Sequence, residues 1–310
     1  MKLRNLLAGA IGAVGVTAVA NRFLSASAET FEPYLDGEAG TYRWRGFDIA
    51  YTEHGDPENE DLLLFHGISA ASSSHEFFPI VDDLAEDYHV IVPDLPGFGH
   101  SDRPPLLYSA SLYTTFVSDA ITDLGDQPVV VANGLTGAYA SEAAAETEID
   151  RLVLITPTDS SMGDRQAWRR GLLRSPVVGE GLFNLLVSKP AIRYFNADHG
   201  YYDPDTLPSD VVDYEWLTAH QEGARFAPAS FVSGFLDPET PLTETLEEVA
   251  EPVTLVWGRN SDVAPLSEGR DLAEAVGAGL VVFDRAKLMA HVEHPDQFVA
   301  VVRDEVYPEP

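Results

Sequence analysis

The chain has 310 residues, of which 50 are Asp or Glu and 19 are Lys or Arg, so its formal net charge at pH 7 is −31. It contains no cysteine, which excludes disulfides, a thiolate nucleophile and cysteine-based metal sites. Neither an EF-hand loop nor a zinc-binding pattern is present, so we expect no metal and no cofactor.

The acidic residues are spread along the chain rather than gathered in one tail, which is typical of proteins adapted to high salt. Binding to a nucleic-acid duplex requires a basic face that displaces counterions from phosphates. No Lys/Arg cluster in the sequence is dense enough to supply such a face. We therefore expect no nucleic-acid partner, and the sequence identifies no protein partner.

Residues 1–28 are predicted to be an N-terminal hydrophobic anchor or signal segment. Two basic residues precede fifteen uncharged ones (6–20), and the segment ends in the sequence Ala26-Ser27-Ala28. As a secretory signal it has a plausible cleavage site. As a transmembrane helix it reaches about 20 residues only if Phe23 and Leu24 extend it, and Arg22 weakens both interpretations. We expect membrane association, or secretion after cleavage, and a peripheral cytoplasmic helix remains a third alternative.

Residues 29–310 are predicted to form one α/β domain, because apolar strand-like runs alternate with helical stretches. Such alternation predicts a mostly parallel, right-handed sheet covered by helices on both faces. Strands are expected near Phe47–Thr52, Leu62–Phe65, His89–Val92, Val129–Val131, Leu152–Ile155, Val253–Trp257 and Leu280–Phe283. Helices are expected at Phe77–Glu86, Ser111–Leu124, Gly137–Glu146, Ser267–Val276 and Asp296–Val306.

Three motifs follow predicted strands. Residues 128–140 read PVVVANGLTGAYA, in which a β-branched run meets small residues and then an alanine-rich helix. Residues 61–67 read DLLLFHG, and residues 90–103 read VIVPDLPGFGHSDR. Together with a Trp-Gly pair at 257–258 and the EHPDQF sequence at 293–298, these motifs resemble the α/β-hydrolase family. The resemblance implies an α/β-hydrolase fold with a helical cap inserted over the active site.

Aligning the family's catalytic positions with this chain leaves all three triad positions without a catalytic side chain. Gly134 stands where the strand-to-helix turn carries the nucleophile, and glycine has no side chain to attack a substrate. In WGRNSDVAP, residues 257–265, Ser261 occupies the position of the acid. In AKLMAHVEHP, residues 286–295, Leu288 occupies the position of the histidine. The resemblance thus implies a degenerate triad.

Other residues could take over the roles of the missing triad side chains. Asp262 lies one residue beyond the acid position and serves only if its loop is rearranged; the alternative is a solvated loop aspartate. His291 lies three residues after the histidine position at Leu288. Its alternative role is that of a partly buried residue in a loop or at the start of a helix. Asp159 follows the strand 152–156 and is either an orienting acid or, with its neighbouring serines, a helix N-cap. Thr136, in the first helical turn, should face away from the site.

The intact His-Gly sequence predicts backbone N–H groups at Gly67 and Ile68 that bind a carboxylate or carbonyl oxygen. Ser69 and Leu135 are assigned to the same part of the pocket. Asp94, in the PDLPGFG turn, is expected to hold that loop.

The cap is expected at about residues 159–245, where strands disappear and aromatic residues are frequent. They are Trp168, Phe183, Tyr194, Phe195, Tyr201, Tyr202, Tyr214, Trp216, Phe226 and Phe231. Such residues form the core of a cap and the lining of an apolar cleft beneath it.

Three functions remain open. The first is a non-hydrolytic, membrane-associated protein with a capped pocket for an apolar or carbonyl-containing small molecule. The second is an active carboxylester-type hydrolase that uses the displaced residues. The third is a structural or interaction protein whose pocket is filled.

Overall fold

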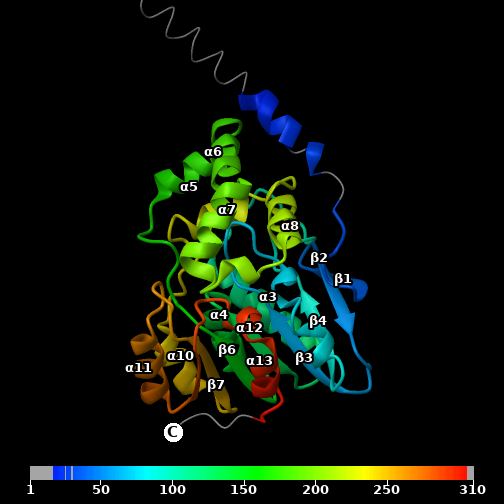
Figure 1. Ribbon diagram of the computed structural model, residues 1–310, viewed down its shortest axis with the longest axis vertical. Coiled ribbons are helices and arrows are strands. Elements are labelled where there is room, and N and C mark those ends of the chain that lie inside the picture. The colour runs from blue at the N-terminus through cyan, green and yellow to red at the C-terminus, as the bar shows by residue number, and fades with distance from the viewer. Residues whose placement is uncertain (1–16, 25, 29–30, 306–310) are drawn as a thin grey trace, which may run out of the picture.

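The computed structural model describes residues 17–24, 26–28 and 31–305. An eight-stranded sheet in the order β1-β2-β4-β3-β5-β6-β7-β8 forms its centre (Figure 1). Strand β2 pairs antiparallel with both β1 and β4, and every other neighbouring pair is parallel. The strands are β1 Glu38–Trp44, β2 Phe47–His54, β3 Glu60–Phe65, β4 Tyr88–Pro93, β5 Val129–Asn133, β6 Arg151–Ile155, β7 Val253–Gly258 and β8 Gly279–Phe283.

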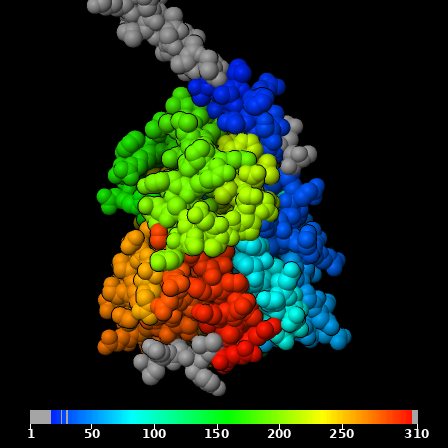
Figure 2. All heavy atoms as spheres, in the orientation of Figure 1, coloured from blue at the N-terminus to red at the C-terminus, as the bar shows by residue number. Residues whose placement is uncertain are grey.

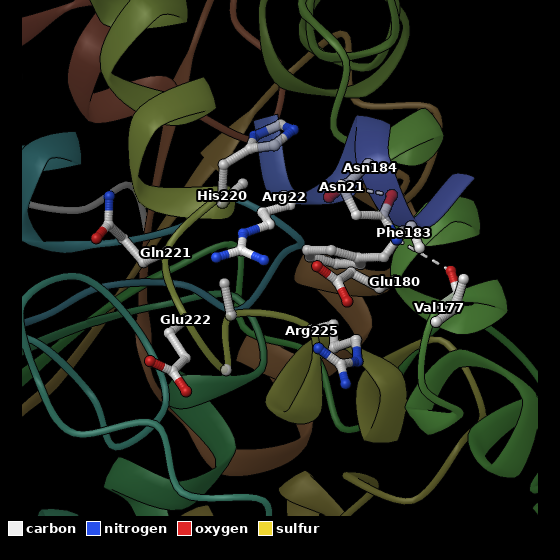
Figure 3. Close-up of a pocket in the computed structure, with 14 residues that line it drawn as sticks. Asn21, Arg22, Val177, Glu180, Phe183, Asn184, His220, Gln221, Glu222 and Arg225 are labelled. Carbon is white, nitrogen blue, oxygen red and sulfur yellow. Dashed lines mark hydrogen bonds between the residues drawn. The ribbon is translucent and has the colours of Figure 1, made fainter. Parts of the chain in front are cut away.

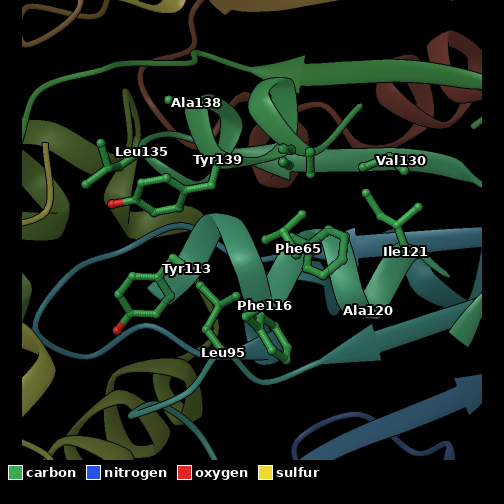
Figure 4. Packing of buried hydrophobic residues seen from close by; sticks show 14 of the residues in the cluster. Phe65, Leu95, Tyr113, Phe116, Ala120, Ile121, Val130, Leu135, Ala138 and Tyr139 are labelled. Atoms are coloured by element: carbon green, nitrogen blue, oxygen red, sulfur yellow. The ribbon is translucent and has the colours of Figure 1, made fainter. Parts of the chain in front are cut away.

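The central strands are buried on both faces because successive side chains point to opposite sides of the sheet. In β3, Leu63 and Phe65 contribute to one apolar cluster, whereas Leu62 and Leu64 contribute to another on the opposite face. Figure 4 shows the first cluster, in which Phe65 packs beside Phe116 of α3 (Ala110–Leu124). Two cores therefore hold the helices to the sheet.

The first core binds α3, α4 (Thr136–Ala144), α10 (Leu242–Glu248) and α11 (Leu266–Val276). The second core binds the short helices η1 (Ser74–Phe77), α2 (Val81–Leu84) and α12 (Ala290–Glu293), and also α13 (Pro295–Val302). The expected doubly covered α/β sheet is thus confirmed.

A helical segment lies between β6 and β7, and we call residues 156–241 the cap. It forms the upper part of the molecule in Figures 1 and 2, beyond the ends of the strands. Its elements are α5 Ala167–Arg174, α6 Val178–Leu186, α7 Lys189–Phe195, η2 Asn196–Gly200, η3 Pro204–Thr206, α8 Ser209–Ala219 and α9 Phe226–Phe231. Helix α10, which follows, packs Leu242 and Leu246 into the first core and so belongs to the body.

The structure differs from the sequence-based expectation at the edges of the fold. Strand β1 was not predicted, because its alternation of exposed and half-buried residues gives only a weak apolar signal. The helix expected at Phe77–Glu86 is instead the separate short helices η1 and α2. Helix α13 ends at Val302, four residues before the expected Val306. These are peripheral elements that tertiary packing, rather than periodicity, defines.

The N-terminal segment lies only partly within the described residues. Residues 17–24 are helical, and residues 1–16, which carry most of the expected anchor, lie outside the described part. Among the described residues, no helix has the length and apolarity required to cross a bilayer.

The stability of the sheet should depend strongly on the contact between α3 and β3. We expect Phe116→Ala to lower the free energy of unfolding by about 3–5 kcal/mol, because the ring is fully buried and its loss leaves a cavity. Leu107→Ala, at a residue with 60% exposure, should change it by less than about 0.5 kcal/mol. Denaturant titration in concentrated KCl measures both, and equal effects would contradict this account.

Candidate active site

The turn between β5 and α4 has the geometry of a nucleophile-bearing turn, with Gly134 at its apex. Gly134 has a φ of +58°, a region that few side chains tolerate. Its N–H donates to the carbonyl of Ile155, and its own carbonyl accepts from the N–H groups of Gly137 and Thr158. A Cβ atom placed on Gly134 would meet no heavy atom within 4 Å. The turn is therefore held rigidly at a position that is open to a side chain.

The loops that carry Ser261 and Leu288 are adjacent. The N–H of Asn260 donates to the carbonyl of Ala286 at 2.9 Å, which ties the loop after β7 to the loop after β8. The amide of Asn133, the residue before Gly134, lies 3.6 Å from the sulfur of Met289. The three expected triad positions thus meet at one edge of the sheet, as parallel strands require.

Ser261, at the position of the acid, forms a hydrogen bond within its own loop and supplies no carboxylate. Ser261 is buried, and its hydroxyl accepts a hydrogen bond from the N–H of Ala264 at 3.1 Å. Asp262 is exposed, and its carboxylate has no hydrogen-bond partner among the described residues. This geometry agrees with the alternative of a solvated loop aspartate.

Asp159 stabilises a different helix from the one expected. Its carboxylate accepts from the N–H of Leu242, the first residue of α10, at 3.2 Å. It therefore satisfies a free donor at the start of α10 rather than capping the segment that follows Asp159. Within the described chain it contacts no histidine.

His291 is sealed in the second core. The side chain is fully buried between the rings of Phe77 and Phe298, whose centroids lie 5.6 and 5.7 Å away. Neither ring nitrogen has a hydrogen-bond partner among the described residues. Burial lowers the pKa of His291 to about 3. The imidazole is therefore neutral and is not oriented for proton transfer.

The carboxyl group of Glu76 lies beside the turn at Gly134, and the sequence did not predict it. Its oxygens accept from the N–H of Gly67 at 3.2 Å and from the amide of Asn133 at 3.0 Å. One oxygen lies 3.9 Å from Nε2 of His291. Burial raises the pKa of Glu76 to about 8, so the group is largely protonated at neutral pH.

Glu76 changes the expected oxyanion site. The N–H of Gly67, expected to face a ligand, is already donated to this carboxyl group. The N–H groups of Ile68 and Leu135 have no acceptor among the described residues. Ser69 is exposed, and its hydroxyl accepts from the N–H of Ala71 and from the Ser72 hydroxyl. Two backbone donors thus remain beside Gly134.

Other polar residues near the turn have structural roles. The fully buried hydroxyl of Thr136 donates to the carbonyl of His66 at 2.7 Å, so it is unavailable as a nucleophile. Nε2 of His66 accepts from the N–H of Leu95, and Nδ1 therefore carries the proton given to the Gly67 carbonyl. Asp94 accepts from the N–H groups of Ser74 and His100, and so holds its loop as expected.

The loop after β8 ties the cap to the body. Lys287 donates to the carbonyls of Ala197 and Asp198, both at 2.9 Å. Glu293 accepts from the N–H of Tyr202 at 2.7 Å and from the N–H of Lys287 at 3.0 Å. The segment that would carry a catalytic histidine is thus bound to η2 and to the residues after it.

The cap contributes further buried polar groups. Burial raises the pKa of Glu215 to about 7, which a hydrogen bond from Asn196 partly offsets. Burial also raises the pKa of Tyr201 well above its ordinary value, and the charges of Glu215, Glu76 and Glu293 add to this effect. Tyr201 is therefore a neutral phenol close to the Glu76 carboxyl.

Two large hollows lie elsewhere on the cap. One, of about 730 Å³, is formed by residues 18–22 together with α6 and the loop at 219–225 (Figure 3). Its lining carries Arg22, Arg225, Glu180 and Glu222. The other, of about 660 Å³, is an apolar surface hollow on α5 to α7. Neither is lined by Gly134, Ser261 or Leu288.

Comparison with known proteins agrees with this architecture. Residues 62–301 match the family described as "Alpha/beta hydrolase family". The chain belongs to the α/β-hydrolase family. It is 28% identical to Lipase 3 of Moraxella sp. (strain TA144) over 235 residues, which cover 70% of this chain and 68% of the relative. It is also 26% identical over 259 residues to 2-hydroxy-6-oxononadienedioate/2-hydroxy-6-oxononatrienedioate hydrolase 2 of Pseudomonas putida, covering 79% of this chain and 87% of that enzyme.

Solved structures show the same fold at lower sequence identity. A membrane phospholipase A, described as a bacterial virulence factor, superposes with a TM-score of 0.66 at 22% identity, over 98% of this chain and 97% of that one. The 2-hydroxy-6-oxo-6-phenylhexa-2,4-dienoate hydrolase of Rhodococcus sp. strain RHA1 superposes with a TM-score of 0.68 at 22% identity. The superposition covers 86% of this chain and 98% of that enzyme. These likenesses establish the fold.

The pair of Glu76 and His291 should shape the pH dependence of stability in this α/β-hydrolase-family chain. Because the folded pKa of Glu76 lies above its ordinary value of 4.5, its contribution is fully present below pH 4.5 and is lost as pH rises through about 8. The lowered pKa of His291 has the opposite effect: its contribution to stability is fully present above pH 6.5 and is lost as pH falls towards 3.

We expect Glu76→Gln to flatten the loss of stability between pH 4.5 and 8 relative to the native chain, because the amide has no proton to lose. Denaturant titrations across this range measure the free energy of unfolding of both chains. Subtracting one profile from the other cancels the contributions of the other carboxylates, which both chains share. Glu58→Gln, at an exposed residue, serves as the matched control. Parallel pH profiles for the native chain and Glu76→Gln would contradict the assignment.

Proposed function

We propose that this α/β-hydrolase-family protein binds an apolar small molecule with a carbonyl or carboxylate group and does not hydrolyse it. The observation that carries the proposal is the turn at Gly134, which keeps the backbone of a nucleophile turn and has open space where the nucleophile would stand. The three triad positions hold a glycine, a leucine and the buried Ser261, whose hydroxyl accepts from the N–H of Ala264, so they offer neither an imidazole nor a carboxylate.

The free N–H groups of Ile68 and Leu135 support the ligand chemistry. They lie on either side of the turn, where backbone donors stabilise a carbonyl oxygen or a carboxylate. Leu135 also precedes the first turn of α4, and the N-terminus of a helix favours a negative group. A ligand held there gains binding energy, while no side chain at Gly134 can attack it.

The relatives that are named hydrolases favour the alternative of an active enzyme, but the displaced candidates do not assemble. Asp262 is exposed, His291 is sealed in the core and Asp159 bonds to α10. No two of them form a hydrogen bond in the described structure. The arrangement therefore supports binding better than turnover.

Membrane association through the N-terminal segment is part of the proposal. The uncharged residues 6–20 supply the apolar stretch. Asn21 fixes the following helical residues to the cap, because its amide donates to the Val177 carbonyl at 3.0 Å and its oxygen accepts from Asn184 at 3.1 Å. A solved protein of the same fold is described as a membrane phospholipase A.

Restoring the triad should create an esterase. We expect the native chain to leave p-nitrophenyl esters unhydrolysed in concentrated KCl, whereas the triple variant Gly134→Ser, Ser261→Asp, Leu288→His turns them over. A gain of at least 10²-fold over background is expected from a positioned nucleophile and base. Stopped assays across several acyl lengths measure both chains.

The double variant Ser261→Asp, Leu288→His is the matched control, because it carries the acid and the imidazole but no nucleophile. This double variant should not hydrolyse the esters. Ester hydrolysis by the native chain that falls on replacing Asp262 or His291 would overturn the proposal and favour the displaced-site enzyme.

Ligand binding should appear at particular backbone amides. On titration of the isotope-labelled chain with butyrate and longer carboxylates, we expect the amide resonances of Ile68 and Leu135 to shift most. Gly67 is the internal control, because its N–H is already donated to Glu76. Unchanged Ile68 and Leu135 resonances with every carboxylate would favour a filled pocket instead.

A further inference from the structure

The basic residues of this strongly acidic chain gather on one part of the cap. Six of the 19 Lys and Arg residues lie between positions 165 and 193, a stretch with a single acidic residue, Glu180. This stretch therefore carries a formal charge of +5 within a chain of −31. Arg165, Arg170 and Arg174 lie close enough for their charges to act on one another.

These charges are largely unpaired. Within the described residues, only Lys189 forms an ion pair, with Asp213 at 2.7 Å. Arg174 donates to the backbone carbonyls of Pro105 and Leu106 rather than to a carboxylate. Burial and the neighbouring charge of Arg165 lower the pKa of Arg170. An acidic protein that leaves arginines without acidic partners keeps a local positive potential.

Apolar side chains are exposed among the same charges. They are Trp168, Leu172, Val178, Leu182, Leu185, Leu186, Tyr194 and Phe195. Leu185 is 69% exposed, Trp168 66% and Tyr194 61%. An apolar hollow of about 660 Å³ lies between α5, α6 and α7. We call these eight side chains and the six basic residues the cap surface.

The N-terminal segment enters the structure beside this surface. Residues 17–24 lie against α6, as Figure 1 shows and as the hydrogen bonds of Asn21 to Val177 and Asn184 require. Val19 and Phe23 of this helical stretch are themselves more than 70% exposed. The first described residues, 17–24, thus lie at the same end of the molecule as the cap surface.

We propose that the cap surface docks on an anionic lipid bilayer. Exposed aromatic and aliphatic side chains enter the interface, while arginines above them contact lipid phosphates. This inference extends the proposed membrane association and is independent of the degenerate triad. Nucleic acid fits less well, because the hollow on this surface is lined mainly by apolar side chains and by no basic residue.

Quenching of Trp168 by lipids with brominated acyl chains tests the docking in the full chain. The other tryptophans should contribute little to the quenching, since Trp44 and Trp257 are buried and Trp216 is half-buried. We expect strong quenching in vesicles that contain phosphatidylglycerol and weaker quenching in phosphatidylcholine alone. Trp168→Phe should abolish the change. Salt should reduce the preference for anionic lipid, because it screens the charges.

Variants separate the two parts of the surface. Leu185→Asp with Tyr194→Asp should reduce quenching in both kinds of vesicle. Arg193→Gln should reduce the preference for anionic lipid by about fivefold, the equivalent of roughly 1 kcal/mol per charge at low salt. Val263→Asp and Arg270→Gln, at exposed residues near α11, are the matched controls and should leave quenching unchanged.

Co-flotation of the chain with vesicles without quenching of Trp168 would overturn the docking and leave N-terminal association intact. Protection of Trp168 that depends on protein concentration would show a second copy on the surface instead. Protection in the monomer without lipid would show that the chain's own N-terminal segment occupies it. Saturable binding of RNA that Arg193→Gln weakens would show a nucleic-acid surface. Each of these results contradicts the proposal.

Discussion

The turn at Gly134 is the constraint on which the site depends. Parallel strands buried on both faces bring their carboxyl ends to one edge of the sheet, so the loops after β5, β7 and β8 must meet there. A left-handed residue is needed between β5 and α4, and glycine meets that need with little strain. The backbone can therefore persist without the side chain that gave the turn its chemistry in hydrolases, and the fold and the reaction are separable.

Beneath this turn, a buried polar network links the loops. Glu76 joins the Gly67 N–H to the side chain of Asn133, and so links the loop after β3 to the end of β5. Its neighbour His291 is neutral and unpaired in the core. Both groups avoid the cost of a buried charge by taking their neutral forms. Glu293 links the loop after β8 to the cap, because its carboxylate accepts from the backbone N–H of Tyr202.

The sequence predicted the centre of the fold well because the buried strands are short β-branched or aliphatic runs bounded by distinctive loops. The apolar runs Leu62–Phe65 and Val129–Val131 need no tertiary information. Glu76 could not be found this way: it lies nine residues after Gly67 in a short 3-10 helix, and only the folded loop shows that they touch. The charge of residues 165–193 can be counted from the sequence, but the exposure of the apolar side chains among them is shown only by the packed helices.

We infer that the site holds no nucleophile, and reaction with a fluorophosphonate tests this inference. The probe forms a covalent bond with an activated serine, so intact-mass spectrometry of the native chain reads the result without knowledge of the substrate. We predict an unchanged mass after incubation in concentrated KCl, with the variant Gly134→Ser, Ser261→Asp, Leu288→His gaining one adduct as the positive control. An adduct on the native chain, located by peptide mapping to a residue of the candidate site, would contradict the claim.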